Sequence, residues 1–203
     1  MPVMDELEAR EAEILGKPQR IASLAADQFN AEATALVVNL RATLGLTTQS
    51  EIPDVFGLML KHPGLFRCQM EMGAQLFRGA IPPRERELAV MRVGWLCRAP
   101  YEWGEHVVQA RRLSISPEEI ERVTKGSTAP GWTPHEAAIL RGVEELLGNQ
   151  MISDDIWGVL ARTWSEQQMI EFPSLIGQYV ATAYSQNSLR VRLAPGSRGL
   201  KER

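Results

Sequence analysis

The 203-residue chain has few of the features that mark disulfide-rich, membrane-spanning or nucleic-acid-binding proteins. Its only two cysteines, Cys68 and Cys97, lack CxxC spacing, which argues against a disulfide scaffold, a zinc ribbon and a dithiol redox site. The net charge of −3 and the pI near 5.7 indicate neither a nucleic-acid partner nor an anionic membrane. Apolar runs such as ALVVNL are too short to span a bilayer, and the acidic N-terminus does not read as a signal peptide. We therefore expect a cytoplasmic protein.

Potential metal ligands are also scarce. The three histidines, His62, His106 and His135, are scattered, and only His106 has a ligand-type neighbour at helical spacing, Glu102. A protein metal site usually needs three or four well-placed ligands. The sequence therefore predicts no metal site.

Signals for β-strands are almost absent, whereas apolar residues recur at intervals of three and four, as in amphipathic helices. Ser116, Thr133 and Ser165 each stand three residues before a Glu or Gln, which is the capping-box pattern of a helix start. Proline follows directly after the first two, at the first helical position. This pattern predicts an all-α, single-domain helical bundle.

The same punctuation divides the chain into three parts. We expect an N-terminal helical arm and extended segment (1–50), a helical domain (51–190), and a C-terminal tail (191–203) that is a surface strap or disordered. The helix over 84–98 is apolar nearly all round, which indicates burial on several sides. A chain of this size rarely encloses a helix completely, so we infer a subunit interface and a homo-oligomer.

The segment YEWGEH contains the only plausible catalytic cluster. Glu102 and His106 are four residues apart, so on a helix they project from the same face. A carboxylate beside an imidazole orients the ring and raises its proton affinity, which makes a minimal acid/base pair. Glu87 lies nineteen residues before His106 and is a third candidate. A pair of this spacing is also common on solvated helix faces, so a surface contact is the alternative.

Three neighbours of this cluster are candidates for substrate binding. Tyr101 and Trp103 are suited to line a site for a planar unsaturated substrate, although ordinary helix packing explains them equally well. Arg92 is suited to bind a substrate carboxylate through two hydrogen bonds, or to pair with a structural glutamate.

The stretch RERELAVMRVGWLCRAPYEWGEHVVQARRLSISPEEI, residues 84–120, resembles the carboxymuconolactone decarboxylase family, which also contains the alkyl hydroperoxide reductase D-like (AhpD-like) peroxidases. The resemblance implies a six-helix fold that assembles as trimers or hexamers. It also implies a site that works without metal or organic cofactor. Glu102 and His106 reproduce the E-x-x-x-H arrangement of the decarboxylase branch, which makes them the implied catalytic residues with Glu87 as a polar neighbour.

The chain departs from the peroxidase branch of that family. The peroxidase signature is a Glu, eleven residues, CxxC, three residues and a His. Aligned on His106, it places the Glu on Glu87 and the two cysteines on Ala99 and Glu102, so neither thiol is present. Cys97 lies nearby but has no partner in the motif. We interpret Cys97 as a buried structural cysteine and Cys68 as a core residue.

We therefore expect a cofactor-independent lyase or isomerase that moves protons on a small carboxylated or lactone-type metabolite, as in aromatic-compound degradation. Two alternatives stay open. One is a peroxidase or antioxidant protein that uses Cys97, and the other is a non-catalytic oligomer that binds a ligand or partner protein.

Overall fold

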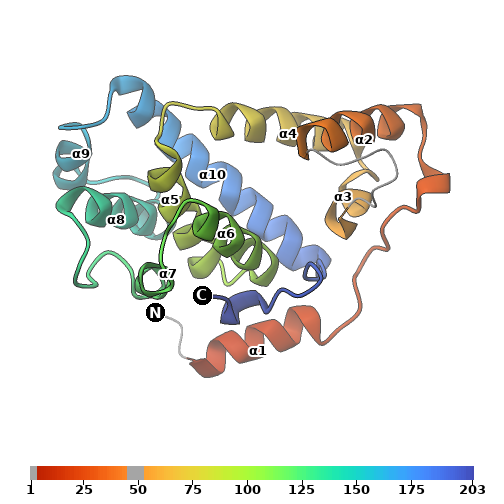
Figure 1. Cartoon of the computed structure of the whole chain (residues 1–203), viewed down its shortest axis with the longest axis horizontal. Helices are drawn as coiled ribbons and strands as arrows, with labels where there is room; N and C mark the ends of the chain where they lie inside the picture. The colour runs from red at the N-terminus through yellow and green to blue at the C-terminus, as the bar shows by residue number, and fades with distance from the viewer. Residues whose placement is uncertain (1–3, 45–52) are drawn as a thin grey trace.

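The computed structural model describes residues 4–44 and 53–203, and helices make up all the regular structure of these residues (Figure 1). The α-helices are α1 (Met4–Leu15), α2 (Ala31–Leu44), α3 (Asp54–Met59), α4 (Pro63–Phe77), α5 (Pro83–Leu96), α6 (Pro100–Arg112), α7 (Pro117–Lys125), α8 (Pro134–Asn149), α9 (Asp154–Leu160) and α10 (Glu166–Leu189). Two short 3-10 turns, η1 (Ala26–Gln28) and η2 (Gly199–Lys201), complete the structure. The all-α prediction is confirmed. The expected helix end near Gly45 and the expected domain boundary after residue 50 lie outside the described residues.

Local capping explains where several helices begin. Asn30 accepts a hydrogen bond from the backbone N–H of Ala33 and so starts α2. Ser116, Thr133 and Ser165 each form the complete capping box that the sequence predicts. No helix in the described part of the chain is long and apolar enough to cross a membrane.

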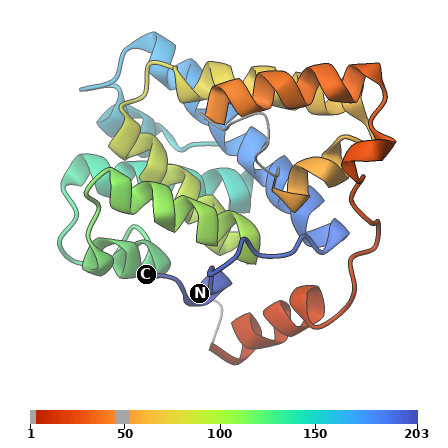
Figure 2. The same cartoon turned by 45° about the vertical axis from the view of Figure 1, so that its right-hand side comes forward.

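Helix α5 lies at the centre of the molecule, packed against α6, α7, α8 and α10 (Figure 2). All its residues from Arg86 to Trp95 are buried within the single chain. One face, with Val90 and Val93, belongs to the core shared with α8 and α10, and the opposite face, with Leu88 and Met91, belongs to the core shared with α6 and α7. The burial of this helix gives no evidence for a subunit interface, because the chain's own helices cover it on all sides. The expectation of an oligomer therefore rests on the family resemblance.

The C-terminal tail is an ordered strap between α1 and α6 (Figure 1). The side chain of Leu200 is 3% exposed and belongs to the same core as Leu7 of α1. The backbone carbonyl of Glu202 accepts a hydrogen bond from the indole N–H of Trp103, at 3.1 Å. The strap therefore closes the side of α6 that faces away from α10.

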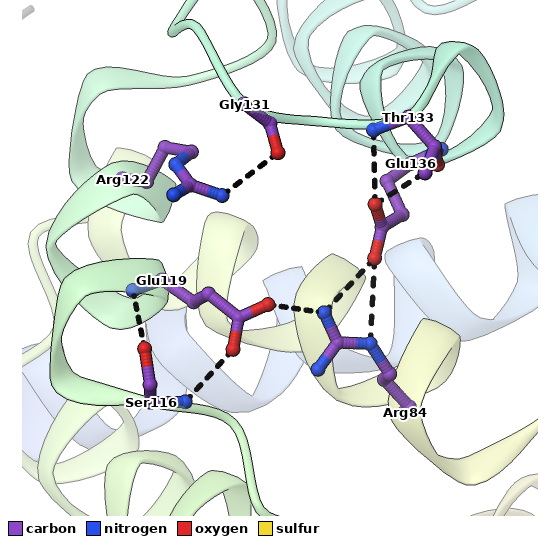
Figure 3. Close-up of polar contacts among 7 residues, drawn as sticks. All are labelled: Arg84, Ser116, Glu119, Arg122, Gly131, Thr133 and Glu136. Carbon is purple, nitrogen blue, oxygen red and sulfur yellow. Dashed lines mark hydrogen bonds and ion pairs between the residues drawn. The ribbon is translucent and has the colours of Figure 1, made fainter.

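Arg84, in the first turn of α5, connects the N-termini of α7 and α8 (Figure 3). Its guanidinium donates to Glu119 and, at 2.9 Å, to Oε1 of Glu136. These glutamates are the N3 residues of the capping boxes formed with Ser116 and Thr133. One arginine thus ties two helix starts to the central helix.

We expect Arg84→Met to lower the free energy of unfolding by about 1–2 kcal/mol, since it removes charge-assisted hydrogen bonds that are partly exposed. The hydrogen bond from Arg84 lowers the pKa of Glu119, and at Glu136 the capping bonds and Arg84 outweigh burial and also lower the pKa. A lowered carboxyl pKa contributes stability that is present above the unfolded pKa and is lost as pH falls through the folded pKa.

Urea unfolding measured between about pH 5 and pH 3 checks both effects: the wild-type protein loses stability more steeply with acid than Arg84→Met does. The exposed Arg162, changed to Met, is the control and leaves both quantities unchanged. Identical acid profiles for the wild type and Arg84→Met would contradict the interpretation.

Candidate active site

The hairpin of α5 and α6 brings the three predicted catalytic residues together. Only residues 97–99 separate the two helices, and Arg98 adopts a positive φ of 48° that lets the chain reverse. Because the helices run antiparallel, Glu87 in the first half of α5 comes to lie beside His106 in the middle of α6. The distance of nineteen residues in sequence becomes a direct contact.

His106 lies between two carboxylates. Its Nδ1 is 2.5 Å from Oε1 of Glu87, and its Nε2 is 3.1 Å from Oε1 of Glu102. The side chains of Glu87 and Glu102 are 5% and 6% exposed, and the His106 side chain is 15% exposed. We call these three residues the Glu–His–Glu group. The alternative of a solvated surface pair does not fit this burial.

The group favours the charged form of His106. A neutral imidazole has one N–H, whereas the imidazolium donates from both nitrogens and so satisfies both carboxylates. Burial of the ring alone would lower its pKa, but the charge of Glu87, the nearby Tyr179 and the hydrogen bonds with Glu102 and Glu87 together raise the pKa of His106 well above its usual value. His106 therefore carries an extra proton beside two carboxylates, Glu87 and Glu102, that can accept it.

Helix α10 supplies two members of the site that sequence reasoning missed. The ring of Tyr179 meets the His106 ring edge-on, with centroids 5.1 Å apart, and burial raises the pKa of Tyr179 against the opposing charge of His106. The Nε2 of Gln186 donates to Oε2 of Glu102 at 2.6 Å. Tyr179 and Gln186 are seven residues apart and so share a helix face. No signal in the sequence indicates that this face meets α6.

A cavity of about 270 Å³, which we call the inner cavity, lies between α3, α4, α6 and α10. It is lined by Val55, Phe56, Met59, Phe66, Gln69, Met70, Tyr101, Glu105, Gln178, Thr182, Ser185 and Gln186. His106 itself is not in the wall. Gln186 belongs both to the wall and to the hydrogen-bonded network of Glu102, so one side chain connects the Glu–His–Glu group to the cavity.

Glu105 is a further residue that the sequence analysis did not single out. It is half-buried and lines both the inner cavity and a second, outer cavity of about 540 Å³, which also contains Asp54 and Arg192. Burial raises the pKa of Glu105, and the charge of Glu102 adds to the rise against the opposing effect of His106. Tyr101 also lines both cavities, one helical turn before Glu105. The pKa of Tyr101 is raised, and burial is the largest cause of this rise.

The structure places the other two predicted binding residues outside the walls of both cavities. Trp103 is 0% exposed within the core of α5, α6 and the strap. The guanidinium of Arg92 is 2.8 Å from Glu144 and also donates to the backbone carbonyls of Val123 and Thr124. Of the alternatives for these residues, helix packing and a structural ion pair describe what is observed, so we retain only Tyr101 as a candidate binding residue.

The two cysteines occupy different environments. Cys97 is half-buried at the end of α5, and burial together with the charge of Glu102 raises the pKa of its thiol to about 11. Cys68 is exposed, so its interpretation as a core residue was wrong. The reason is helical phase: it stands two residues from Phe66 and from Met70, which face inward, and therefore points to the opposite side of α4.

Comparison with known proteins supports the motif around His106. The model of the carboxymuconolactone decarboxylase family matches residues 63–145, which include Glu87, Glu102 and His106. No curated protein sequence matches the chain.

Solved structures share the fold at low sequence identity. An alkylhydroperoxidase AhpD core, an uncharacterized peroxidase-related protein from Ralstonia eutropha JMP134, superimposes with a TM-score of 0.74 and 14% identity over 88% of this chain and 94% of that chain. A peroxidase-related protein from Silicibacter sp. TM1040 superimposes with a TM-score of 0.71 and 16% identity, over 88% of this chain and 95% of that chain. The debrominase Bmp8, in complex with 2,3,4-tribromopyrrole, superimposes with a TM-score of 0.67 and 16% identity, over 88% of this chain and 93% of that chain. Residues 63–145 thus match the model of the carboxymuconolactone decarboxylase family, and the chain shares its fold with solved AhpD-like structures.

Proposed function

We propose that the protein is a cofactor-independent lyase or isomerase, in which the Glu–His–Glu group transfers protons to and from a small molecule in the inner cavity. The observation that carries the proposal is the position of His106 between two buried carboxylates, at 2.5 and 3.1 Å. Strongly perturbed titratable groups beside a cavity are typical of acid/base sites.

The roles follow from what each side chain contacts. Glu87, at 2.5 Å, anchors Nδ1 of His106 from helix α5. Glu102 lies between His106 and Gln186, which makes it the carboxylate nearer to the cavity. Glu102 therefore takes a proton from one carbon of the substrate and returns it to a second carbon of the resulting dienolate, and the His106 imidazolium, held between the two carboxylates, orients Glu102 and balances its charge. Such general acid/base steps each contribute about 10²–10⁴ in rate.

A thiol peroxidase is supported less well. Peroxide reduction needs a thiolate, and a thiol with a pKa of about 11 is almost entirely protonated at neutral pH. The positions that carry cysteines in the peroxidase signature are Ala99 and Glu102 in this chain. The Glu–His–Glu group, by contrast, needs no sulfur for proton transfer.

Proton transfer can be tested without knowing the product. The protein is incubated in D₂O with unsaturated lactones, their carboxylated analogues and conjugated cyclic ketones, and deuterium incorporation at carbon is followed by mass spectrometry. We expect exchange with at least one of these classes, and a loss of about 10²–10⁴ in its rate in His106→Gln and in Glu102→Gln.

The second His–Glu pair of the chain provides the matched control. His135 Nε2 is 3.3 Å from Glu85, away from the inner cavity, so His135→Gln retains the exchange activity. Cys97→Ala also retains it. The acid/base proposal is refuted if His106→Gln retains the exchange activity. It is also refuted if the wild-type protein catalyses exchange with none of the probes. Retained ligand binding in a Glu102→Gln/His106→Gln double variant, without turnover by the wild type, indicates a binding protein instead.

A further inference from the structure

A small cavity of about 130 Å³ lies where α1 and the segment after it meet the end of α10 (Figure 1). Its wall includes Arg10 and Glu13 of α1, Arg20 of the following segment, and Arg190 directly after α10. We call it the arginine cavity. Unlike the inner and outer cavities, it has a mostly polar wall, and it shares no lining residue with either of them. A polar ligand is therefore the kind that it suits.

The wall of the arginine cavity has an excess of positive charge. Among the described residues it contains three arginines and one carboxylate, that of Glu13, which leaves two positive charges at neutral pH. Oε2 of Glu13 is 2.9 Å from Nη1 of Arg10, so this carboxylate engages one of the three guanidinium groups. The hydrogen bond from Arg10, together with the charges of Arg10, Lys17 and Arg190, lowers the pKa of Glu13. Several cations thus act on the same place and favour a negative charge there.

The other two guanidinium groups have few partners within the described ranges. The Arg20 side chain takes part in no hydrogen bond or ion pair there, and Arg190 donates once, to the carbonyl of Pro18 at 3.4 Å. The carbonyl of Leu15 at the end of α1 already accepts from Arg192, at 2.6 Å. The dipole of α10 favours a cation at its end, which explains one arginine but not the convergence of three. Because a guanidinium has five N–H donors, most of those of Arg20 and Arg190 are left for a ligand.

We propose that the arginine cavity binds a free, doubly charged oxyanion of the phosphate or sulfate type between Arg20 and Arg190, with Arg10 at its edge. The planar guanidinium fork matches the oxygens of such an ion, and two excess positive charges balance one dianion. The cavity is smaller than the pockets of about 300–1,000 Å³ that hold larger organic ligands. A bound dianion joins α1 and the segment after it to the end of α10, and so holds the N-terminal arm against the helical domain.

Isothermal titration calorimetry tests the charge and the type of ion. The wild-type protein is titrated with inorganic phosphate, sulfate, acetate and glycerol 3-phosphate at constant ionic strength and mildly alkaline pH, where phosphate is mainly a dianion. We expect phosphate and sulfate to bind one ion per chain, and acetate to bind at least about tenfold more weakly because it carries one charge. Tighter binding of glycerol 3-phosphate than of phosphate would overturn the assignment to a free ion.

Variants assign the binding to the arginine cavity. Arg20→Gln and Arg190→Asn each weaken the binding of phosphate by about 3–10-fold, as expected when one nearby cation is removed. Asparagine tolerates the left-handed backbone of position 190, where φ is 57°, so Arg190→Asn preserves the end of α10. Glu13→Gln removes the competing carboxylate and strengthens binding by a similar factor. Arg162→Gln, on an exposed turn outside the wall, is the matched control and leaves the affinity unchanged.

Limited proteolysis provides a second readout. Phosphate should slow tryptic cleavage after Arg20, because the bound ion holds this segment against α10, and Arg190→Asn should lose this protection. Absence of phosphate and sulfate binding, equal affinities for phosphate and acetate, or equal weakening in Arg162→Gln and Arg190→Asn would overturn the proposal. The inference does not depend on the proposed function, since neither readout requires turnover or the Glu–His–Glu group.

Discussion

Glu87→Gln is expected to lower the free energy of unfolding by about 3 kcal/mol at neutral pH, the lower end of the cost of breaking a buried ion pair by removing one partner. Its carboxylate is 5% exposed and 2.5 Å from Nδ1 of His106, so the amide leaves the imidazolium with Glu102 alone. Equilibrium urea unfolding measures the difference. The double variant Glu87→Gln/His106→Gln should be more stable than the sum of the single effects predicts, because the two residues interact directly.

The same pair controls the pH dependence of stability on the alkaline side. The raised pKa means that the folded protein binds the His106 proton more tightly than the unfolded chain does. The resulting stability is complete below the unfolded histidine pKa of about 6.5 and is lost as pH rises through the folded pKa. Unfolding of the wild type should therefore become easier above neutrality.

The variants make this pH effect specific. Glu87→Gln reduces the alkaline loss and His106→Gln removes it, whereas His135→Gln retains it as the matched control. A wild-type stability that stays constant from about pH 6 to pH 9 would show that His106 does not hold an extra proton in the folded state.

Trp103→Ala is expected to cost about 3–5 kcal/mol of stability, the range for removing a large aromatic side chain from a core. The indole is 0% exposed, its ring centroid is 4.9 Å from that of Trp95, and its N–H donates to the carbonyl of Glu202. Thermal and urea unfolding measure the loss. Trp157 is 45% exposed, so Trp157→Ala is the matched control and should lower the free energy of unfolding by about 1 kcal/mol or less.

A comparison of Trp103→Ala with Tyr101→Phe separates packing from ligand binding. Tyr101→Phe is expected to change the deuterium-exchange rate with little effect on stability, because Tyr101 lines the inner cavity. If Trp103→Ala instead left stability unchanged and altered the exchange rate, Trp103 would be a binding residue, as the sequence first allowed.

Much of the fold follows from local sequence. Ser116, Thr133 and Ser165 start their helices because a capping box is completed within four residues, so no distant contact is needed. Glu102 and His106 were paired for the same reason, since one turn of helix brings them together wherever α6 lies.

Tertiary structure decided which of these local features form the site. The antiparallel hairpin of α5 and α6 made Glu87 a direct partner of His106, and the packing of α10 added Tyr179 and Gln186. It also assigned Arg92 to an ion pair with Glu144, a partner 52 residues away that no sequence spacing reveals.

The sequence by itself thus determined the helices, the family motif and the i,i+4 pair, because helical geometry depends only on neighbours along the chain. Burial, cavity walls and the protonation of His106 depend on which helix faces meet. Glu105 shows the difference: it is next to His106 in sequence, yet the helix rotation between adjacent residues places it in the wall of the inner cavity. Only the packed bundle determines which of two adjacent residues lines a cavity and which belongs to the buried Glu–His–Glu group.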